Sequence, residues 1–142
     1  MEPVHLGVIL DSSIAIEAER QRLDVARFLK RVSERIGERE AALCSISVAE
    51  LAHGVHRANT PERRQARRAF LDDLKATVVI YPITAETAEL AGKIHAESVR
   101  QGITIPFDDL LIGACALERG YAIATRNQRH FQKIPGLKLI PF

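Results

Sequence analysis

The sequence has few of the features that mark zinc-binding, secreted or membrane proteins. It contains only two cysteines, Cys44 and Cys115, and neither lies in a CxxC motif or a Cys/His cluster. We therefore expect reduced thiols in a core and no zinc site of the cysteine type. No apolar run approaches the roughly 20 residues that a membrane span needs, and residues 1–5 do not begin a secretion signal. These absences predict a cytoplasmic protein with no membrane contact.

Aromatic residues and the motifs of several enzyme classes are also scarce. Five Phe, two Tyr and no Trp argue against a broad surface for stacking bases. A Walker loop, a GxGxxG motif and a Ser-His-Asp constellation are missing, which leaves nucleotide binding and covalent catalysis without support. What is present is 46% apolar and 27% charged residues in a chain of 142. This balance predicts one globular domain with a substantial core.

Short apolar stretches alternate with helical patterns along the chain. We expect strands at residues 6–10, 42–46, 78–81, 121–125 and 137–140. We expect helices at residues 14–22, 24–36, 48–58, 61–76, 84–102 and 109–119. Thr60 is the expected cap of the helix that begins at Pro61. Alternating strands and helices predict a single α/β domain over residues 1–142, with a mainly parallel sheet covered on both faces.

Three acidic residues lie where a hydrophobic segment gives way to a helix. Asp11 lies in VILDSS, Glu50 in SISVAEL and Asp109 in PFDDLLIGA. If these segments are neighbours in a parallel sheet, the carboxylates meet at its carboxyl edge, where α/β proteins bind ligands. Clustered carboxylates repel one another, and a divalent cation relieves that repulsion. The pattern predicts a site of oxygen ligands, which suits Mg²⁺ or Mn²⁺ better than zinc.

Each acid also has a purely structural interpretation as a helix cap. Asp11 could cap the first helix, and Asp108 could cap a helix that begins at Asp109. Ser47 and Glu50 match a capping box, in which Glu50 reaches back to the backbone N–H of Ser47. Taken one at a time, these patterns do not separate a cap from a metal ligand.

Four blocks, in order and spanning nearly the whole chain, resemble those of one protein family. They are VILDSS at 8–13, SISVAELAHGV at 45–55, DLLIGACAL at 109–117, and ATRNQRHF at 124–131 with IPGL at 134–137. Together they are similar to the PIN domain, specifically the toxin ribonucleases of the VapBC type. The resemblance implies a three-layer α/β/α fold with about five strands and a metal-dependent endoribonuclease activity. It also implies an RNA substrate, a small antitoxin protein as partner and a homodimer.

The resemblance assigns roles to the acidic residues. Asp11, Glu50 and Asp109 match the catalytic, metal-binding acids of the family. Asp109 is preferred over Asp108 because the family's acid directly precedes the triplet that is Leu-Leu-Ile here, which leaves Asp108 as a cap or a supporting acid. Mg²⁺ is the expected cofactor, with Mn²⁺ able to replace it. The expected chemistry is phosphodiester hydrolysis by a metal-activated water, with one of the three acids as a candidate general base.

Four further residues near these acids match or depart from the family pattern. Ser13, Thr125 and Asn127 match polar positions that support the metal or its water. His130 departs from the pattern, because many relatives carry an Asp there, and a fourth acidic ligand is therefore not expected. The structural interpretation of His130 is a loop histidine packed beside Phe131.

Basic residues supply candidate contacts for RNA phosphates. Arg126 and Arg129 lie beside the expected site and are the better candidates. Five more arginines fall within twelve residues, with pairs one helical turn apart; they are Arg57, Arg63, Arg64, Arg67 and Arg68. A solvated helix face would give the same pattern.

Two other functions are compatible with the sequence. The first is a PIN-like module that binds RNA or protein without catalysis, in which the acids only cap helices. The second is a PIN nuclease of RNA processing, which would use the same chemistry. Dependence of cleavage on metal and on Asp11 separates the catalytic from the non-catalytic hypothesis.

Overall fold

Five parallel strands form the centre of the molecule. In the computed structural model, which describes residues 6–142, their order across the sheet is β3-β2-β1-β4-β5. The strands are β1 (Gly7–Leu10), β2 (Glu40–Cys44), β3 (Val79–Tyr81), β4 (Ala122–Thr125) and β5 (Leu139–Pro141). The helices are α1 (Ser12–Arg20), α2 (Val25–Ile36), α3 (Ser45–Arg57), α4 (Pro61–Thr77), α5 (Ala85–Arg100), α6 (Phe107–Arg119) and α7 (Gln128–Phe131). The expectation about a secretion signal falls on residues 1–5, outside the described part of the chain.

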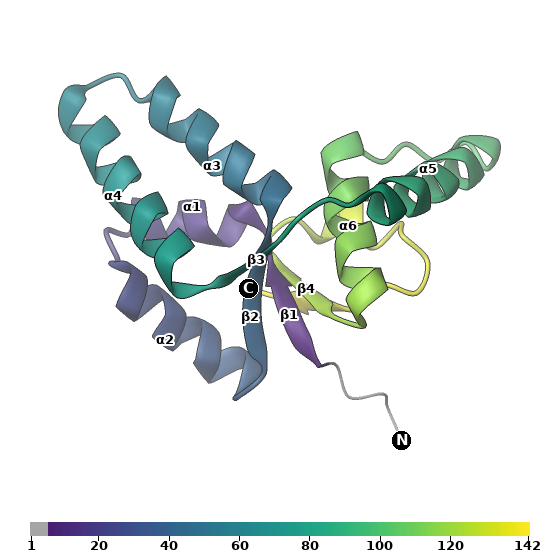
Figure 1. Cartoon of the computed structure of the whole chain (residues 1–142), viewed down its shortest axis with the longest axis horizontal. Helices are drawn as coiled ribbons and strands as arrows, with labels where there is room; N and C mark the ends of the chain where they lie inside the picture. The colour runs from purple at the N-terminus through teal and green to yellow at the C-terminus, as the bar shows by residue number, and fades with distance from the viewer. Residues whose placement is uncertain (1–5) are drawn as a thin grey trace.

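Helices cover both faces of the sheet, as Figure 1 shows: α1 to α4 lie on one side, and α5 and α6 lie on the other. The central strand β1 divides its side chains between two cores because successive residues of a strand point to opposite faces. Val8 and Leu10 belong to the core under the first group of helices, together with Phe28. Ile9 belongs to the core under the second group, together with Ile112. The predicted three-layer α/β/α fold with a parallel sheet is confirmed.

Two helices, α2 and α4, begin at a residue whose side chain caps the first turn of the helix. Thr60 accepts a hydrogen bond from the backbone N–H of Arg63 at 3.1 Å, and Pro61 is the first residue of α4. Asp24 was expected inside its helix, but it is the cap of α2 and accepts from the N–H of Arg27 at 2.8 Å. These short polar side chains satisfy N–H groups that no helical carbonyl can reach.

The second strand was predicted two residues too late. It was expected at 42–46, but β2 is Glu40–Cys44 and α3 already begins at Ser45. Parallel pairing decides the position, because Ala42 pairs with Val79 in β3 and Gly7 of β1 pairs with Glu40. The short helix α7 was missed altogether, since four residues are too few to show helical periodicity.

The two cysteines, distant in sequence, come together in the second core. Cys44 ends β2, Cys115 lies on α6, and both are free and fully buried. The Cys115 thiol lowers the pKa of Cys44 to about 7, despite the opposing effect of burial. The prediction of unpaired core thiols is confirmed. Within residues 6–142, no helix combines the length and apolar character required to cross a membrane.

Candidate active site

Asp11 lies at the carboxyl end of β1, beside the end of β4. Its backbone N–H donates to the carbonyl of Ala124 at 2.9 Å, which places it next to Thr125. The residue takes the cap position of α1, but its side chain makes no capping hydrogen bond. Instead, Oδ2 accepts from Ser13 Oγ at 2.7 Å and from Thr125 Oγ1 at 2.8 Å. The capping interpretation of Asp11 is therefore wrong: two hydroxyl groups hold this buried carboxylate.

Glu50 lies on α3 and faces the same sheet edge. It accepts a hydrogen bond from Ser12 Oγ at 3.2 Å. The capping box with Ser47 is wrong because α3 begins at Ser45, so Ser47 lies inside the helix with its hydroxyl fully buried. Burial, a hydrogen bond with the Asp108 carboxyl and the nearby charges of Asp11 and Asp108 raise the pKa of Glu50 to about 7. Glu50 is therefore part of an electrostatic cluster of acids.

Asp109 lies in the first turn of α6 and is 7% exposed. Burial, followed by the charge of Asp108, raises its pKa to about 6, while a hydrogen bond from His130 acts in the opposite direction. The charge of Asp11 contributes to the increase. The assignment of Asp108 as a cap is wrong, because α6 begins at Phe107 and Asp108 is an exposed residue of the first turn. Its carboxylate instead adds negative charge beside Glu50 and Asp109.

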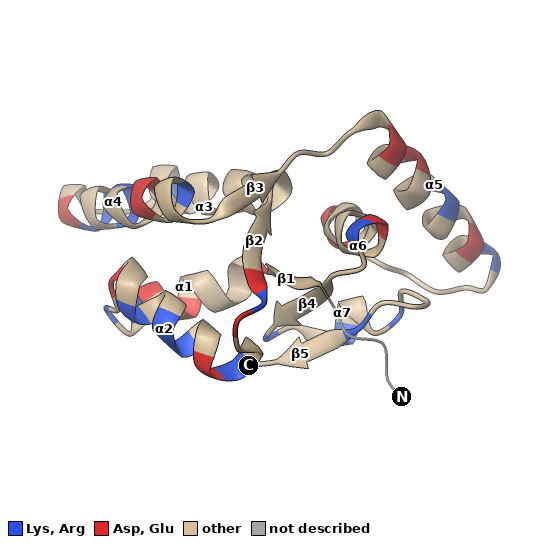
Figure 2. Ribbon diagram, turned by 60° about the horizontal axis from the view of Figure 1, so that its bottom comes forward, with Lys and Arg blue, Asp and Glu red and all other residues tan. Residues whose placement is uncertain are grey.

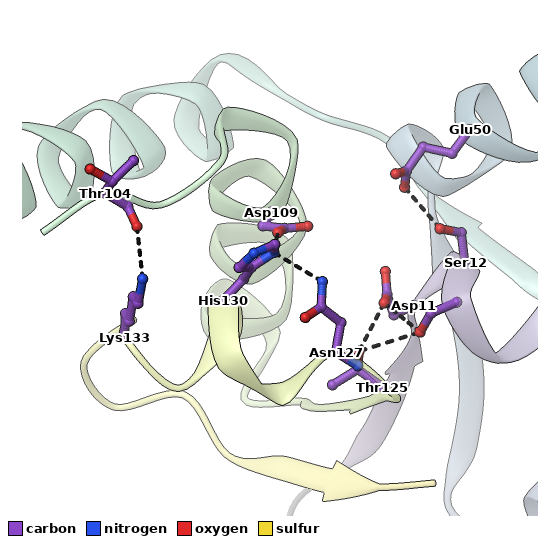
Figure 3. A network of polar contacts seen from close by, with 10 residues as sticks. Asp11, Ser12, Glu50, Thr104, Asp109, Thr125, Asn127, His130 and Lys133 are labelled. Carbon is purple, nitrogen blue, oxygen red and sulfur yellow. Dashed lines mark hydrogen bonds and ion pairs between the residues drawn. The ribbon is translucent and has the colours of Figure 1, made fainter.

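Figure 3 shows the three acids on different elements around one edge of the sheet. The sequence analysis expected this meeting from neighbouring parallel strands, and Asp11 and Glu50 do follow the neighbouring strands β1 and β2; Asp109 instead follows a loop between α5 and α6, so the expected strand before it is wrong. Three of the supporting residues also meet there. Thr125 is fully buried, Ser13 Oγ lies 3.4 Å from Thr125 Oγ1, and the backbone N–H of Asn127 donates to Thr125 Oγ1 at 2.8 Å. Because Thr125 Oγ1 bonds both Asp11 and the backbone of Asn127, it fixes Asp11 relative to the segment that follows β4.

Two residues have site contacts that the sequence analysis missed. Ser12 donates to Glu50, and its only sequence signal is its place directly after Asp11. His130 is not simply packed beside Phe131, as its structural interpretation supposed. It lies on α7, where Nδ1 is 2.8 Å from Asp109 Oδ2 and 2.9 Å from Asn127 Nδ2. No periodic pattern could have predicted this contact, because it depends on a four-residue helix.

The donor set fits a hard divalent cation in its chemistry. The charges of Asp11 and Asp108 contribute to the raised pKa values of Glu50 and Asp109, so the carboxylates repel one another and a cation would offset that repulsion. In residues 6–142, no three Asp, Glu, His or Cys side chains are arranged closely enough to hold a metal ion. Binding therefore requires side-chain movement of the acids toward one another.

The arginines expected to contact phosphate are largely engaged within the chain. Figure 2 shows basic and acidic residues mixed along the α4 ribbon. Arg67 bonds Glu19 at 3.0 Å and the carbonyl of Gly54 at 2.7 Å, and Arg68 pairs with Asp72. These contacts match the interpretation of α4 as a structural, solvated face.

The arginines beside the site differ from each other. Arg126 forms an ion pair with Glu17 at 2.7 Å, whereas Arg129 is exposed at the start of α7. A groove of about 560 Å³ lies between α1, α3 and α4 and reaches Glu50. Its lining includes the acid Glu19, the arginines Arg20, Arg57, Arg63 and Arg67, and His53. A charged ligand in this groove would therefore contact both the basic residues and the cluster of acids.

Comparison with known proteins defines the class of protein. Residues 8–137 match the PIN domain family. The chain is 31% identical to ribonuclease VapC1 of Rickettsia felis over 135 residues, which are 95% of this chain and 96% of that one. It is 32% identical to the tRNA(fMet)-specific endonuclease VapC of Shigella flexneri over 110 residues, 75% of this chain and 80% of the relative. The chain belongs to the PIN domain family.

Solved structures agree with this assignment. The fold matches VapBC2 of Rickettsia felis bound to a DNA fragment from its promoter, with a TM-score of 0.80 and 25% identity. That match covers 95% of this chain and 98% of the other. The DNA-bound VapBC of Salmonella typhimurium gives a TM-score of 0.79 at 25% identity, covering 96% of this chain and 98% of the other. The family resemblance drawn from the four sequence blocks is confirmed.

Proposed function

We propose that this chain is the toxin of a type II toxin–antitoxin pair and hydrolyses RNA phosphodiester bonds as a metal-dependent endoribonuclease. The observation that carries the proposal is the meeting of Asp11, Glu50 and Asp109 at one edge of a PIN-domain sheet. Relatives similar over most of the chain are ribonucleases and endonucleases, which supports a nuclease activity.

In this mechanism Asp11, Glu50 and Asp109 would hold Mg²⁺, or Mn²⁺ in its place. The ion, when bound, activates water and offsets phosphate charge. Ser13 and Thr125 would hold the Asp11 carboxylate in a fixed orientation, because both hydroxyls donate hydrogen bonds to its Oδ2. One of the acids accepts the proton that the attacking water loses.

RNA is the proposed substrate, and its phosphates approach from the open side of the acids. Arg129 is the stronger candidate for a phosphate contact, because it is exposed and no protein partner occupies its side chain among the described contacts. Arg126 would first have to leave Glu17. The small number of aromatic residues favours recognition by shape and hydrogen bonds over base stacking.

A small antitoxin is the proposed partner, and the homodimer is the proposed assembly of the toxin itself. Structural neighbours of the chain are VapBC complexes from Rickettsia felis and Salmonella typhimurium, which supports an antitoxin partner. The two free, buried cysteines support a reducing compartment, the cytoplasm, as the place of action.

One observation favours the alternative of a PIN-like module that binds without catalysis. The acids of the described chain are not already arranged around a metal point. An RNA-processing nuclease, the other alternative, would use the same acids and differs only in the RNA that it cleaves.

Cleavage of total cellular RNA by the purified chain tests the proposal. The reaction is run with Mg²⁺, with Mn²⁺ and with EDTA, and Asp11→Asn is prepared identically to detect a contaminating nuclease. Asp72→Asn serves as the matched control, because it makes the same chemical change on the exposed face of α4. Discrete products that need metal and disappear only in Asp11→Asn are expected. Equal cleavage by Asp11→Asn would contradict the site, and a folded chain that neither cleaves RNA nor binds Mn²⁺ would favour the binding module.

A further inference from the structure

His130 makes a specific contact with one oxygen of Asp109. Its Nδ1 atom lies 2.8 Å from Asp109 Oδ2, and the Asp109 side chain is 11% exposed. The imidazole is 37% exposed, so it lies at the border between the acids and solvent. Figure 3 shows the His130 ring next to one oxygen of the Asp109 carboxyl, while the other carboxyl oxygen points toward the side of Asp11 and Glu50. His130 therefore contacts Oδ2 of Asp109, whereas Oδ1 faces the other acids.

Buried residues that follow His130 anchor its part of the backbone. Phe131 follows it in α7 and is fully buried in the second core, and Ile134 is 2% exposed. Lys133 Nζ donates to the carbonyl of Thr104 at 3.1 Å, which ties the segment after α7 to the chain before α6. Because its backbone is anchored in this way, His130 approaches Asp109 with a defined geometry.

A continuous set of hydrogen bonds joins the two acids through the segment that carries His130. Thr125 Oγ1 donates to Asp11 and accepts from the N–H of Asn127. The side chain of Asn127 lies 2.9 Å from His130 Nδ1, which in turn contacts Asp109. The two carboxylates lie at the end of β1 and on α6, far apart in sequence, and hydrogen bonds through residues 125–130 connect them.

The chemistry of the pair sets the direction of the hydrogen bond. An ionised carboxylate can only accept, so Nδ1 must carry the hydrogen when Asp109 is charged and able to bind a cation. The structure places Asn127 Nδ2 against His130 Nδ1 at 2.9 Å, and a protonated Nδ1 cannot accept from it; with Nδ1 as donor, the Asn127 amide must be turned by a half-turn so that its oxygen faces the N–H. Donation to Oδ2 leaves Oδ1 of Asp109 as the oxygen free for a cation.

We propose that His130 is a positioning residue, which donates a hydrogen bond to Asp109 Oδ2 and so directs Oδ1 toward the metal. The proposal rests on the proposed function, because it assumes that Asp109 is a metal ligand. Groups that orient metal ligands in this way contribute about 10–100-fold to metal affinity. His130 thereby takes part in metal binding without adding a fourth negative charge.

Metal binding to the purified full chain tests this role, with calorimetric titration of Mn²⁺ and of Mg²⁺ as the readout. His130→Leu removes the donor, whereas His130→Asn keeps an amide N–H at nearly the distance of Nδ1 from the backbone. His56→Asn is the matched control, since His56 is exposed on α3. We expect His130→Leu to weaken Mn²⁺ binding about 10–100-fold and His130→Asn to restore most of it. Thermal unfolding without metal shows that each variant is folded.

The outcomes separate this inference from the proposed function. If Asp11→Asn abolishes Mn²⁺ binding but His130→Leu binds as tightly as wild type, the role of His130 is overturned and the metal site stands. If His130→Asn binds as weakly as His130→Leu, the donated hydrogen bond is not what matters, and the inference is overturned. If the wild-type chain binds neither ion, both the inference and the metal-dependent function are overturned.

Discussion

Thr125 Oγ1 donates a hydrogen bond of 2.8 Å to Asp11 Oδ2, although the two residues are 114 positions apart in the sequence. The bond joins the ends of β1 and β4, which are neighbours in the sheet. Both side chains are buried, so the carboxylate depends on protein donors in place of water. Thr125 is therefore expected to matter for stability as well as for the geometry of the acids.

The first prediction concerns the hydroxyl of Thr125. Thr125→Val keeps the shape of the side chain but removes a donor to Asp11 and an acceptor for the N–H of Asn127. We expect the free energy of unfolding, measured by urea denaturation, to fall by about 1–3 kcal/mol. RNA cleavage should fall as well. Thr125→Ser keeps the hydroxyl and is the control; equal loss in both variants would contradict the prediction, because the hydroxyl hydrogen bonds would then not account for the effect of Thr125→Val.

A second prediction separates metal binding from folding. Asp11→Asn removes a negative charge that disfavours ionised Glu50 and Asp109, and its amide oxygen can still accept from Ser13. The metal-free free energy of unfolding should therefore change by less than about 1 kcal/mol, because lost charge-assisted bonds and relieved repulsion oppose each other. Mn²⁺ should raise the melting temperature of the wild type but not that of the variant. A large loss of metal-free stability would instead mean that the Asp11 charge is structural.

The third prediction concerns the arginines of α4. Arg67 donates to both Glu19 and the carbonyl of Gly54, and so ties α4 to α1 and α3. Arg67→Ala should lower the free energy of unfolding by about 1–3 kcal/mol, since two bonds at partly buried groups are lost. Arg68→Ala removes only an exposed pair one helical turn apart and should change it by about 0.5 kcal/mol or less. Urea denaturation measures both, and equal effects would contradict a structural role specific to Arg67.

Much of the fold follows from local patterns in the sequence. The five strands and six longer helices were predicted because strand-sized apolar runs and helical periodicity are repeated along the chain. Thr60 and Pro61 predicted the start of α4 because an N-cap acts within its own turn. The boundary between β2 and α3 was wrong because it depends on the pairing of β2 with β1 and β3.

The site was predictable only where the sheet itself brings residues together. Asp11 and Glu50 follow the neighbouring strands β1 and β2, so parallel topology placed them at a common edge, whereas Asp109 follows a loop and was matched to the site only by the family resemblance. The capping box at Ser47 was wrong because its pattern is short enough to occur inside a helix. The contact of His130 with Asp109 depends on how α7 packs through Phe131, which no local pattern encodes.

The last prediction concerns pH and metal as competitors for the same carboxylates. Without metal, the pKa of Glu50 is raised to about 7 and that of Asp109 to about 6, from ordinary values of 4.5 and 3.8. The folded state therefore holds protons that the unfolded chain has already released. This contribution to stability is complete below the ordinary values and is lost as the pH rises through 6 and 7.

The comparison of wild type with Glu50→Gln isolates this effect from the titration of other groups. In EDTA, urea denaturation between pH 5 and 8 should show the wild type losing stability relative to Glu50→Gln, which keeps a neutral side chain throughout. Saturating Mn²⁺ should reverse the trend for the wild type, because the ion binds the ionised acids and gains affinity as their protons leave. A constant difference between the two proteins across this range would show that Glu50 does not share the charge of Asp11 and Asp108. In that case the three acids would not form one electrostatic site, and the cation would lose its main reason to bind there.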